Sequence, residues 1–362
     1  MSGGPSYQLA KINKKLGKHV PFYIVVTDLG TAHATWFRSK RCDKIFVASE
    51  RIKKLAKRRG RFRDDRIVLT GLPIRQSFAD EAEKLSDRTT EEGKAYQRTV
   101  RENLQIDPDR KMVLVMGGGE GVGGLEKIVD ELYTEFTKEG VTASIYVVCG
   151  RNEKLKASLA TKDWSKVLAG EHKPKKRRIL SRIFRRGKKN VRDTEDGEES
   201  YQGDVKVVGL GFVTQMAEYM VAADILVSKA GPGRCKTAIT RDSYFLNVDL
   251  LLTNDFISGT IAEAACVGLP VMMTSFLPGQ EAGNVDVVLE NEFGAYNDDP
   301  VEIAQQVAAW MKDPELVNEM SRKAKKVGRP HAAADIVLEM GTAANAWKKL
   351  SPKSKRMTDL KL

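Results

Sequence analysis

Two glycine-rich turns carry the clearest chemical signal in this 362-residue sequence. The first lies in MVLVMGGGEGVGG, residues 112–124, where an apolar run enters glycines and then a helical pattern. Glycine lets backbone N–H groups approach a phosphate without hindrance from Cβ atoms, and the N-terminus of the next helix adds partial positive charge. We therefore predict that Gly117, Gly118, Gly119 and Gly121 contact a nucleotide.

The same turn also matches a dinucleotide-binding pattern, G-x-G-x-x-G, through Gly119, Gly121 and Gly124. A dehydrogenase of that kind needs an acidic residue at the end of the next strand to hold the ribose. The next apolar run, SIYVVCGRN, contains Arg151 at that place instead. A dehydrogenase is therefore disfavoured, while a plain tight turn stays an alternative.

The second turn, AGPG at residues 230–233, is separated from the helix that such a turn normally enters. That helical pattern, GTIAEAACVGLP, begins at residue 259, after 25 intervening residues, 234–258. Since both glycine turns follow strand-like runs, they predict one nucleotide crevice at the carboxyl edge of a parallel sheet.

Short polar side chains follow the second turn in one segment. Glu263 lies one turn into the helix, where a carboxylate can accept both hydroxyls of a ribose. Gln280, Glu281 and Asn284 lie in a glycine-rich stretch and suit the hydroxyls of a sugar. Each of them could also be an ordinary cap or surface residue, but their succession favours a nucleotide-sugar site.

Alternating strand and helix patterns position these residues. Eight apolar, β-branched runs predict buried parallel strands within residues 20–30, 43–49, 66–71, 111–117, 143–150, 205–211, 223–229 and 269–275. Helical periodicity appears at residues 49–58, 125–138, 214–223, 259–267 and 300–312. This order predicts an α/β protein with doubly wound parallel sheets and ligands at the carboxyl ends of the strands.

A polar stretch, residues 80–105, divides the strands into two groups. We interpret residues 1–105 as an N-terminal domain with its link and residues 106–330 as a second domain. Residues 331–362 form a closing helix and tail, because Ile336, Met340, Ala343 and Trp347 recur every three or four residues.

The overall charge favours polyanionic partners. Sixty Lys and Arg against 48 Asp and Glu give a net charge of +12, which suits nucleic acid, an anionic membrane or phosphorylated substrates. The four cysteines are far apart in the sequence, so they predict neither a zinc site nor a disulfide framework. No apolar run approaches the roughly 20 residues of a spanning helix, and no secretory signal is evident.

Residues 164–204 contain a highly charged insertion. Ten Lys or Arg lie between Lys173 and Lys189, and acidic residues follow. The composition is typical of a solvated loop. Alternatively, Ile179, Leu180, Ile183 and Phe184 could form one side of a short basic helix that lies on anionic lipid.

Taken together, seven motifs resemble the plastid monogalactosyldiacylglycerol synthases, relatives of the bacterial lipid II glucosaminyltransferase. The motifs are VTDLGTAHATWF, TGLPIRQSF, VLVMGGGEG, VVCGRN, GFVTQM, AGPG with TIAEA, and GLPVMMTSFLPGQEAGN. The resemblance implies a GT-B fold of two Rossmann-like domains. It also implies that UDP-galactose binds the C-terminal domain and that diacylglycerol approaches the N-terminal domain at the membrane.

The resemblance also assigns roles to residues. It places Phe212 and Val213 at the uracil and Glu263 on the ribose, with Arg151 and the first glycine turn also on the donor side. Around the diphosphate it places Gly231, Pro232, Gly233 and Thr260, and at the galactose it places Gln280, Glu281 and Asn284. Trp36 matches an aromatic on the acceptor side, although Ala34 stands where the family usually has proline.

The reaction implied is an inverting transfer of galactose to the sn-3 hydroxyl of 1,2-diacylglycerol, without a metal or other cofactor. The family's base is expected in an N-terminal glycine-rich loop that ends in histidine, which this sequence lacks, so we expect an incomplete N-terminal domain. His33 and Asp28 are the remaining candidates for proton transfer. The position of a candidate base relative to the acceptor decides its role before its pKa does.

The interruption at residues 234–258 has two possible explanations. Joining Gly233 to Thr260 restores the family's continuous AGPGTIAEA, so the segment is either an inserted loop or translated intron sequence. Intron sequence is the explanation that we favour, because an insertion would separate the phosphate-binding turn from the helix that assists it. We therefore expect reduced activity from the chain as it stands.

We expect peripheral association with a plastid envelope through anionic lipids, with no transit peptide in this sequence and no nucleic-acid partner. Two alternatives remain: a GT-B lipid glycosyltransferase for another sugar or acceptor, and a non-catalytic basic protein that binds membranes or nucleic acid.

Overall fold

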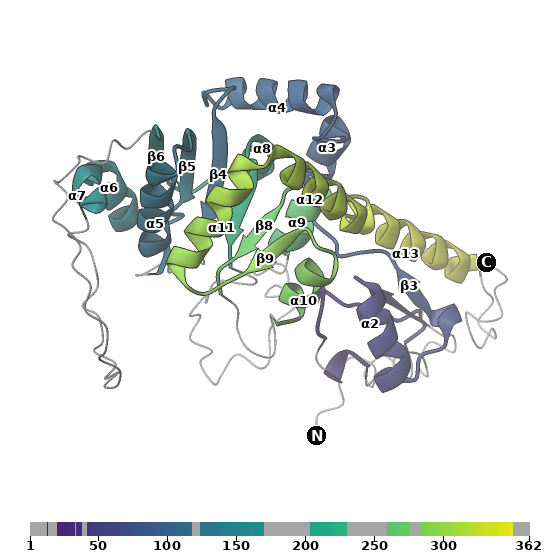
Figure 1. The fold of residues 1–362 in the computed structure, drawn as a ribbon. Coiled ribbons are helices and arrows are strands. Elements are labelled where there is room, and N and C mark those ends of the chain that lie inside the picture. The colour runs from purple at the N-terminus through teal and green to yellow at the C-terminus, as the bar shows by residue number, and fades with distance from the viewer. Residues whose placement is uncertain are drawn as a thin grey trace, which may run out of the picture.

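The larger sheet of the protein has six parallel strands in the order β6-β5-β4-β7-β8-β9 (Figure 1). The computed structural model describes residue 13 and residues 20–32, 34–37, 42–117, 124–169, 203–229, 259–275 and 282–349. The strands are β4 (Lys111–Met116), β5 (Ala143–Val148), β6 (Val205–Leu210), β7 (Ile225–Ser228), β8 (Val271–Met273) and β9 (Gly294–Tyr296). Apolar, β-branched residues favour strands that are covered on both faces.

Alternate residues of β4 divide the core of this sheet into two layers. Val113 and Val115 are buried against α5 (Gly124–Lys138) and α11 (Pro300–Lys312). Met112 and Leu114 are buried on the other face, against α8 (Met216–Ala222) and α9 (Gly259–Cys266). Helices on both faces make the sheet doubly wound, as the sequence predicted.

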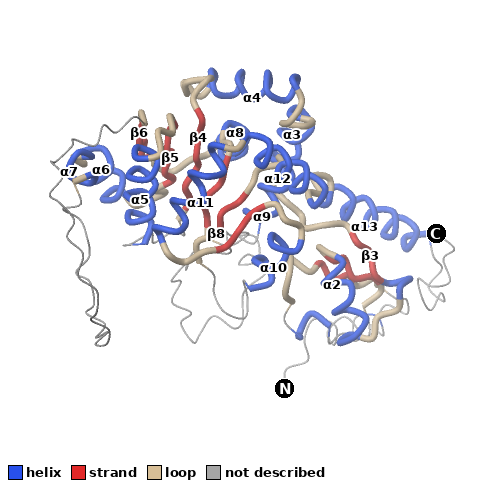
Figure 2. Tube along the Cα trace, in the orientation of Figure 1, coloured by secondary structure: helices blue, strands red, loops and turns tan. Residues whose placement is uncertain are grey.

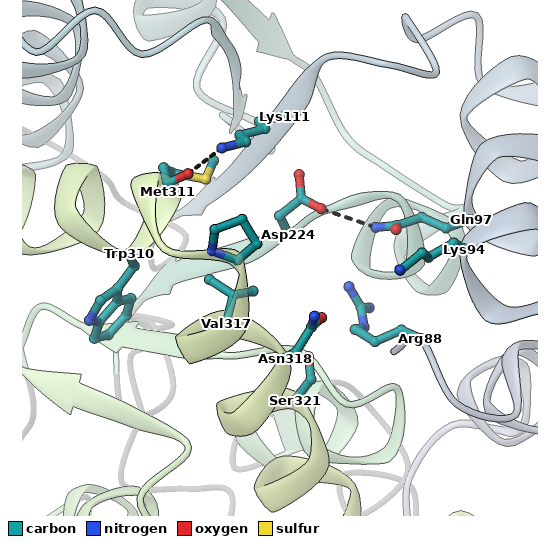
Figure 3. A pocket seen from close by; sticks show the side chains of 11 residues that line it. Arg88, Lys94, Gln97, Lys111, Asp224, Trp310, Met311, Val317, Asn318 and Ser321 are labelled. Carbon is teal, nitrogen blue, oxygen red and sulfur yellow. Dashed lines mark hydrogen bonds between the residues drawn. The ribbon is translucent and has the colours of Figure 1, made fainter. Parts of the chain in front are cut away.

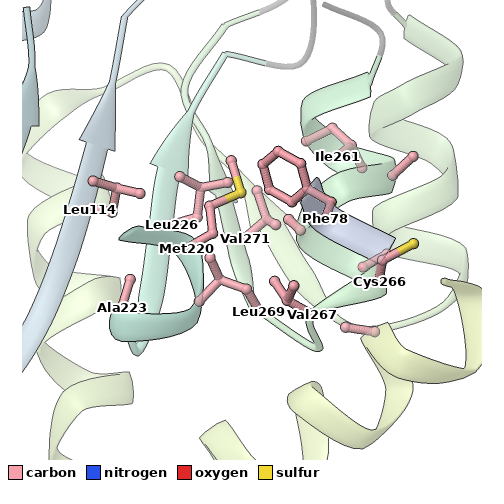
Figure 4. Packing of buried hydrophobic residues seen from close by; sticks show 14 of the residues in the cluster. Phe78, Leu114, Met220, Ala223, Leu226, Ile261, Cys266, Val267, Leu269 and Val271 are labelled. Atoms are coloured by element: carbon pink, nitrogen blue, oxygen red, sulfur yellow. The ribbon is translucent and has the colours of Figure 1, made fainter. Parts of the chain in front are cut away.

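The core on the α8–α9 face is completed by a helix from the N-terminal part of the chain. Phe78, on α3 (Gln76–Leu85), is fully buried among Met220, Leu226 and Ile261 (Figure 4). Burial of a phenylalanine contributes about 1.5–3 kcal/mol. This packing ties α3 to the larger sheet.

The smaller sheet has three parallel strands in the order β1-β2-β3. They are β1 (Tyr23–Val25), β2 (Lys44–Val47) and β3 (Ile67–Leu69). Phe37, Ile45 and Ile52 lie in a separate apolar cluster beside this sheet. Two separate cores agree with the predicted pair of sheets, while the domain limits stay a prediction.

The stretch that we interpreted as a polar link is largely helical. It contains most of α3 and all of α4 (Glu91–Asn103), and both helices contact α8. Arg101 Nη2 donates to Asp224 at 2.9 Å, and Arg101 Nε donates to the carbonyl of Ala222 at 2.8 Å. The segment therefore packs with the larger sheet while it joins the two parts of the chain.

Two C-terminal helices return the chain toward the smaller sheet. After α12 (Pro314–Val327), α13 (Ala332–Lys349) extends past β3 (Figure 1). Lys44 of β2 pairs with Glu339 of α13. Ile336 and Ala343 are buried, which confirms these two positions of the predicted apolar stripe.

All eight predicted strands are confirmed, and the other elements complete the outline in Figure 2. Those elements are α2 (Glu50–Leu55), the one-turn helices η1 (Ala34–Phe37), η2 (Ala56–Gly60) and η3 (Asp64–Arg66), α6 (Glu153–Thr161), α7 (Trp164–Leu168) and α10 (Ala282–Glu290). Among the described residues, no helix is long and apolar enough to cross a membrane.

Candidate functional site

Most of the described candidate donor residues lie at the carboxyl edge of the larger sheet. Gly117 follows β4, Arg151 follows β5, and Phe212 and Val213 follow β6. In-register parallel pairing of these three strands brings the segments to the same edge. This is the edge at which open α/β sheets bind ligands.

Glu263 is buried at this site and holds a two-point ion pair. Its side chain is 3% exposed. Arg75 Nε donates to Oε1 of Glu263 at 2.7 Å, and Arg75 Nη2 donates to Oε2 at 2.9 Å. Arg75 immediately precedes α3 and is 188 residues away in sequence, so the pair joins α3 to α9.

The carboxylate of Glu263 lies close to the first turn of α9. A Cβ atom placed on Gly259 would lie 3.6 Å from Oε1 of Glu263. The first turn of a helix presents free N–H groups and partial positive charge, which stabilise an anion. Thr260, predicted to contact the diphosphate, lies in the same turn.

Arg75 therefore places a second positive group beside that helix end. The guanidinium also lies 4.7 Å from the centre of the Phe78 ring. Its side chain is 55% exposed, so it can be reached from solvent. Fixed positive charge of this kind suits a diphosphate, which gathers negative charge as it leaves.

The residues assigned to the uracil differ in exposure. Phe212 is 72% exposed, whereas Val213 is partly buried and packs against the core. Arg151 is exposed. An exposed aromatic ring beside a strand end is available to contact a planar base.

On the smaller sheet, Asp28 and Trp36 are joined directly. Trp36 Nε1 donates to Asp28 Oδ2 at 2.8 Å. Asp28 follows β1, and Trp36 lies on η1, where the neighbouring Phe37 is buried. The hydrogen bond fixes the indole against the end of the strand.

A contact between two glycines brings the loop that follows β1 to the larger sheet. A Cβ atom on Gly283, in the first turn of α10, would lie 2.3 Å from the carbonyl carbon of Gly30. Only glycine fits both sides of such a contact. Asn284, predicted to face the sugar, is the next residue and is 4% exposed.

Ion pairs hold α2 to α10 beside the glycine contact. Arg51 of α2 reaches Asp286 at 2.7 Å and Glu290 at 2.9 Å. Ser49 Oγ donates to the carbonyl of Leu29 at 2.7 Å, which fixes the loop after β1. The loop that carries Asp28 and Trp36 therefore lies beside the segment that carries Asn284, although their sequence positions differ by about 250 residues. We call the first the candidate acceptor loop.

Nine candidate residues lie outside the described residues. They are His33, Gly118, Gly119, Gly121, Gly231, Pro232, Gly233, Gln280 and Glu281. Their roles stay as predicted from the sequence. Sequence reasoning did not single out Arg75, although it lies in the motif TGLPIRQSF.

The fold is that of GT-B glycosyltransferases. A solved structure with this architecture, MurG of Acinetobacter baumannii, superposes with a TM-score of 0.52 at 12% identity. The match covers 93% of this chain and 77% of the other.

Sequence comparison then gives the family. The family model for monogalactosyldiacylglycerol (MGDG) synthase matches residues 6–74. The probable monogalactosyldiacylglycerol synthase 2, chloroplastic, of Oryza sativa subsp. indica is 33% identical over 90% of this chain and 54% of its own length. Monogalactosyldiacylglycerol synthase 1, chloroplastic, of Arabidopsis thaliana is 30% identical over 91% of this chain and 48% of its own. The chain belongs to this family, and it spans about half the length of the relatives that it matches.

Proposed function

We propose that the protein is a galactosyltransferase that moves galactose from UDP-galactose to the sn-3 hydroxyl of 1,2-diacylglycerol. The observation that carries this proposal is the match to monogalactosyldiacylglycerol synthases over about nine-tenths of the chain. The site supports it, because Glu263, Arg75 and the first turn of α9 lie together at the carboxyl edge. That combination suits a nucleoside diphosphate.

The donor site requires Glu263 to exchange partners. In the structure both carboxylate oxygens accept hydrogen bonds from Arg75. When UDP-galactose binds, the two ribose hydroxyls replace the guanidinium, and Arg75 turns toward the diphosphate. A guanidinium binds a phosphate by the same two-point geometry as a carboxylate, so the exchange conserves charge-assisted hydrogen bonds.

The acceptor would approach beside Asp28 and Trp36. The hydroxyl oxygen of diacylglycerol attacks the anomeric carbon of galactose, and its proton passes to a base. The bond from that carbon to the diphosphate breaks, and UDP leaves with the electron pair, so the configuration inverts. Asp28 is the described residue that we propose for the base, since Trp36 holds its carboxylate in place.

Positive groups of the protein would take the place of a metal in this reaction. The guanidinium of Arg75 and the N–H groups at the start of α9 face the position that we assign to the diphosphate. Electrostatic stabilisation of a leaving group by fixed donors costs no reorganisation during the reaction. We propose that transfer needs no cofactor.

The place of action that we propose is the plastid envelope. The relatives from rice and Arabidopsis are named chloroplastic. Diacylglycerol resides in a membrane, and the protein's net charge of +12 favours an anionic surface. Peripheral contact would therefore bring the acceptor loop to its substrate, without any role for nucleic acid.

A transfer assay tests this function. The full chain is incubated in EDTA with UDP-galactose and diacylglycerol in vesicles, beside a variant that lacks residues 234–258. We expect monogalactosyldiacylglycerol as the product, at a higher rate from the shortened variant, because it rejoins AGPG to GTIAEA and so brings the phosphate-binding turn back to its helix. UDP-glucose and vesicles without diacylglycerol serve as controls.

Two different outcomes of this assay would contradict us. No galactolipid from either form would refute the proposed activity. Full and equal rates from both forms would leave the activity standing and refute our interpretation of residues 234–258 as an interruption of the site.

A further inference from the structure

A cavity lies at the amino edge of the larger sheet, opposite the candidate donor site (Figure 3). Its volume is about 230 Å³. Lys111, the first residue of β4, and Asp224, the residue before β7, contribute to its wall. The donor residues follow the strands, whereas these two residues start or precede them. The cavity is therefore a separate location on the molecule.

Helices from two distant parts of the chain enclose the cavity. The segment from Arg88 through α4 forms one wall, and the end of α11 with the start of α12 forms the other. In Figure 3 the side chains of Arg88, Lys94 and Asn318 lie around the same opening. Nothing in the proposed galactosyl transfer uses these residues.

Arg88 is a buried cation without a salt bridge to any described residue. Its side chain donates to the carbonyls of Met220 at 3.0 Å, Ala223 at 2.6 Å and Val267 at 2.9 Å. These bonds use three of the five N–H groups of a guanidinium. Burial lowers the pKa of Arg88 to about 10, so the group is still charged at neutral pH.

The one acidic side chain in the wall already has cationic and amide partners. Asp224 accepts hydrogen bonds from Arg101 Nη2 at 2.9 Å and from the backbone N–H of Met112 at 2.7 Å. Its charge is thus balanced by Arg101, which is not among the lining residues. Burial lowers the pKa of Arg88 more than the attraction of Asp224 and Asp87 raises it, so these carboxylates offset only part of the cost of burying the guanidinium.

Two lysines add to the positive charge of the wall. Lys111 donates to the carbonyl of Met311, a neutral partner. Lys94 pairs with Glu91 at 2.9 Å, but this is an exposed pair on the surface of α4, and such pairs contribute little and exchange readily. Gln97 Nε2 already donates to the carbonyls of Ala222 and Ala223 and to Asp224 Oδ1, so the lysines and the amide of Asn318 are the donors that a ligand would meet.

We propose that this cavity binds a small soluble phosphate anion. The wall offers the cations Arg88, Lys94 and Lys111 and the amide of Asn318, and an entering anion would add negative charge beside a buried guanidinium that forms no ion pair with a described carboxylate. The cavity is smaller than the roughly 300–1,000 Å³ of sites for drug-sized ligands, which favours a ligand about the size of a phosphate group. Because the two edges of the sheet are far apart, phosphate and UDP should bind together.

Equilibrium dialysis of the full chain with radiolabelled inorganic phosphate tests this site. Binding is measured at constant ionic strength, with and without saturating UDP. We expect saturable binding that UDP does not displace. Lys94→Glu and Asn318→Asp should each weaken it about tenfold, because each places a negative charge at the opening.

The variants were chosen so that misfolding does not confuse the result. Lys94 is exposed and Asn318 is half-buried, whereas Arg88 holds three backbone carbonyls and is left intact. Lys138→Glu, at the exposed end of α5, makes the same charge change as Lys94→Glu outside the cavity and should bind phosphate normally. Circular dichroism checks the fold of each variant.

Three outcomes of the dialysis with inorganic phosphate would overturn the inference, and a fourth comes from a vesicle experiment. They are no saturable binding, equal binding by all variants, and binding that UDP abolishes, which would place phosphate in the donor site. Vesicles with and without phosphatidic acid distinguish a lipid headgroup from a soluble anion. If the protein binds vesicles that contain phosphatidic acid in a way that depends on Lys94, but does not bind inorganic phosphate, then the ligand is a lipid headgroup and the proposed soluble ligand is wrong. None of these outcomes would refute galactosyl transfer.

Discussion

At the scale of single residues, the Arg75–Glu263 pair decides what the candidate donor site can do. Glu263 is almost fully buried and Arg75 is half-exposed, so the carboxylate depends on its partner more than the guanidinium does. An unpaired buried carboxylate is costly, whereas an exposed arginine is solvated. This asymmetry allows Arg75 to leave once a ligand satisfies Glu263.

Replacing Arg75 should therefore affect stability and UDP affinity together. Arg75→Gln removes the charge that faces Glu263 and the diphosphate. We expect the free energy of unfolding to fall by about 1 kcal/mol, discounted because Arg75 is half-exposed. We also expect the Kd for UDP to rise about tenfold, measured by calorimetry.

The matched control for Arg75 is an arginine in an ion pair away from the site. Arg98 pairs with Asp109, and both side chains are exposed. Arg98→Gln should leave stability and UDP affinity nearly unchanged. If Arg75→Gln behaved like this control in both measurements, the proposed role of Arg75 would be wrong.

At the scale of elements, α9 combines a polar first turn with an apolar remainder. Gly259 and Thr260 begin the helix near the candidate diphosphate site, and Cys266 ends it in the core. Burial raises the pKa of the Cys266 thiol to about 12 from an ordinary value of 9.0. The thiol thus stays protonated in the folded protein at alkaline pH.

This pKa shift makes stability depend on pH in a defined direction. The unfolded chain releases the Cys266 proton above about pH 9, while the folded chain keeps it until about pH 12. The contribution of the Cys266 thiol to the free energy of unfolding is fully present below pH 9 and is lost as the pH rises from about 9 to about 12. The loss is about 1.4 kcal/mol per pH unit for one proton.

Cys266→Ala isolates this contribution. Chemical denaturation between pH 9 and pH 11 should show a shallower loss of stability in the variant than in the unmodified protein, by about 1.4 kcal/mol per pH unit. A constant offset from the lost packing is expected at every pH. Parallel pH profiles would show that the Cys266 thiol does not titrate as its burial indicates.

The elements also show how far sequence reasoning could go. Runs such as residues 111–117 are apolar and β-branched over a whole strand, so periodicity predicted them. Periodicity also predicted a helix at residues 300–312, and in the structure Asp299 caps α11 and Pro300 occupies its first turn. Local signals of this kind need no tertiary information.

Elements with weak local signals escaped prediction. Strand β9 is only three residues long and includes Gly294. Helix α10 begins Ala-Gly-Asn, which is typical of a loop, and the Gly30 contact explains the glycine. Arg75 was missed because its partner is 188 residues away, and no local pattern records such a contact.

At the scale of the whole molecule, the two sheets meet at the Gly30–Gly283 contact. Arg51 pairs with two acids of α10 beside it, and α13 returns to the smaller sheet. The candidate acceptor residues belong to one sheet and the candidate donor residues to the other. The proposed transfer between them would require that this contact hold the two together.

Gly283→Ala should disturb transfer more than donor binding. Alanine favours a helix, so α10 itself should not be damaged. Its Cβ atom would lie 2.3 Å from the backbone of Gly30 and Thr31, and the two loops must move apart. We expect the transfer rate to fall more than about tenfold, because small misplacements of reacting groups are costly, while the Kd for UDP stays within about twofold.

A glycine without neighbours provides the control for this variant. Gly341 of α13 has no atom within 4 Å of the position that a Cβ would take. Gly341→Ala should preserve transfer and stabilise the helix by up to about 1 kcal/mol. Equal transfer rates in both alanine variants would contradict the role of the glycine contact.

The central claim is that the carboxyl edge of the larger sheet binds UDP through Glu263, and calorimetric titration tests it directly. UDP is titrated into the shortened chain that lacks residues 234–258 and into the same chain with Glu263→Gln. We predict saturable binding that the substitution weakens about tenfold or more, since a charge-assisted hydrogen bond contributes about 1.5–3 kcal/mol. No binding to either form, or the same affinity in both, would contradict this assignment.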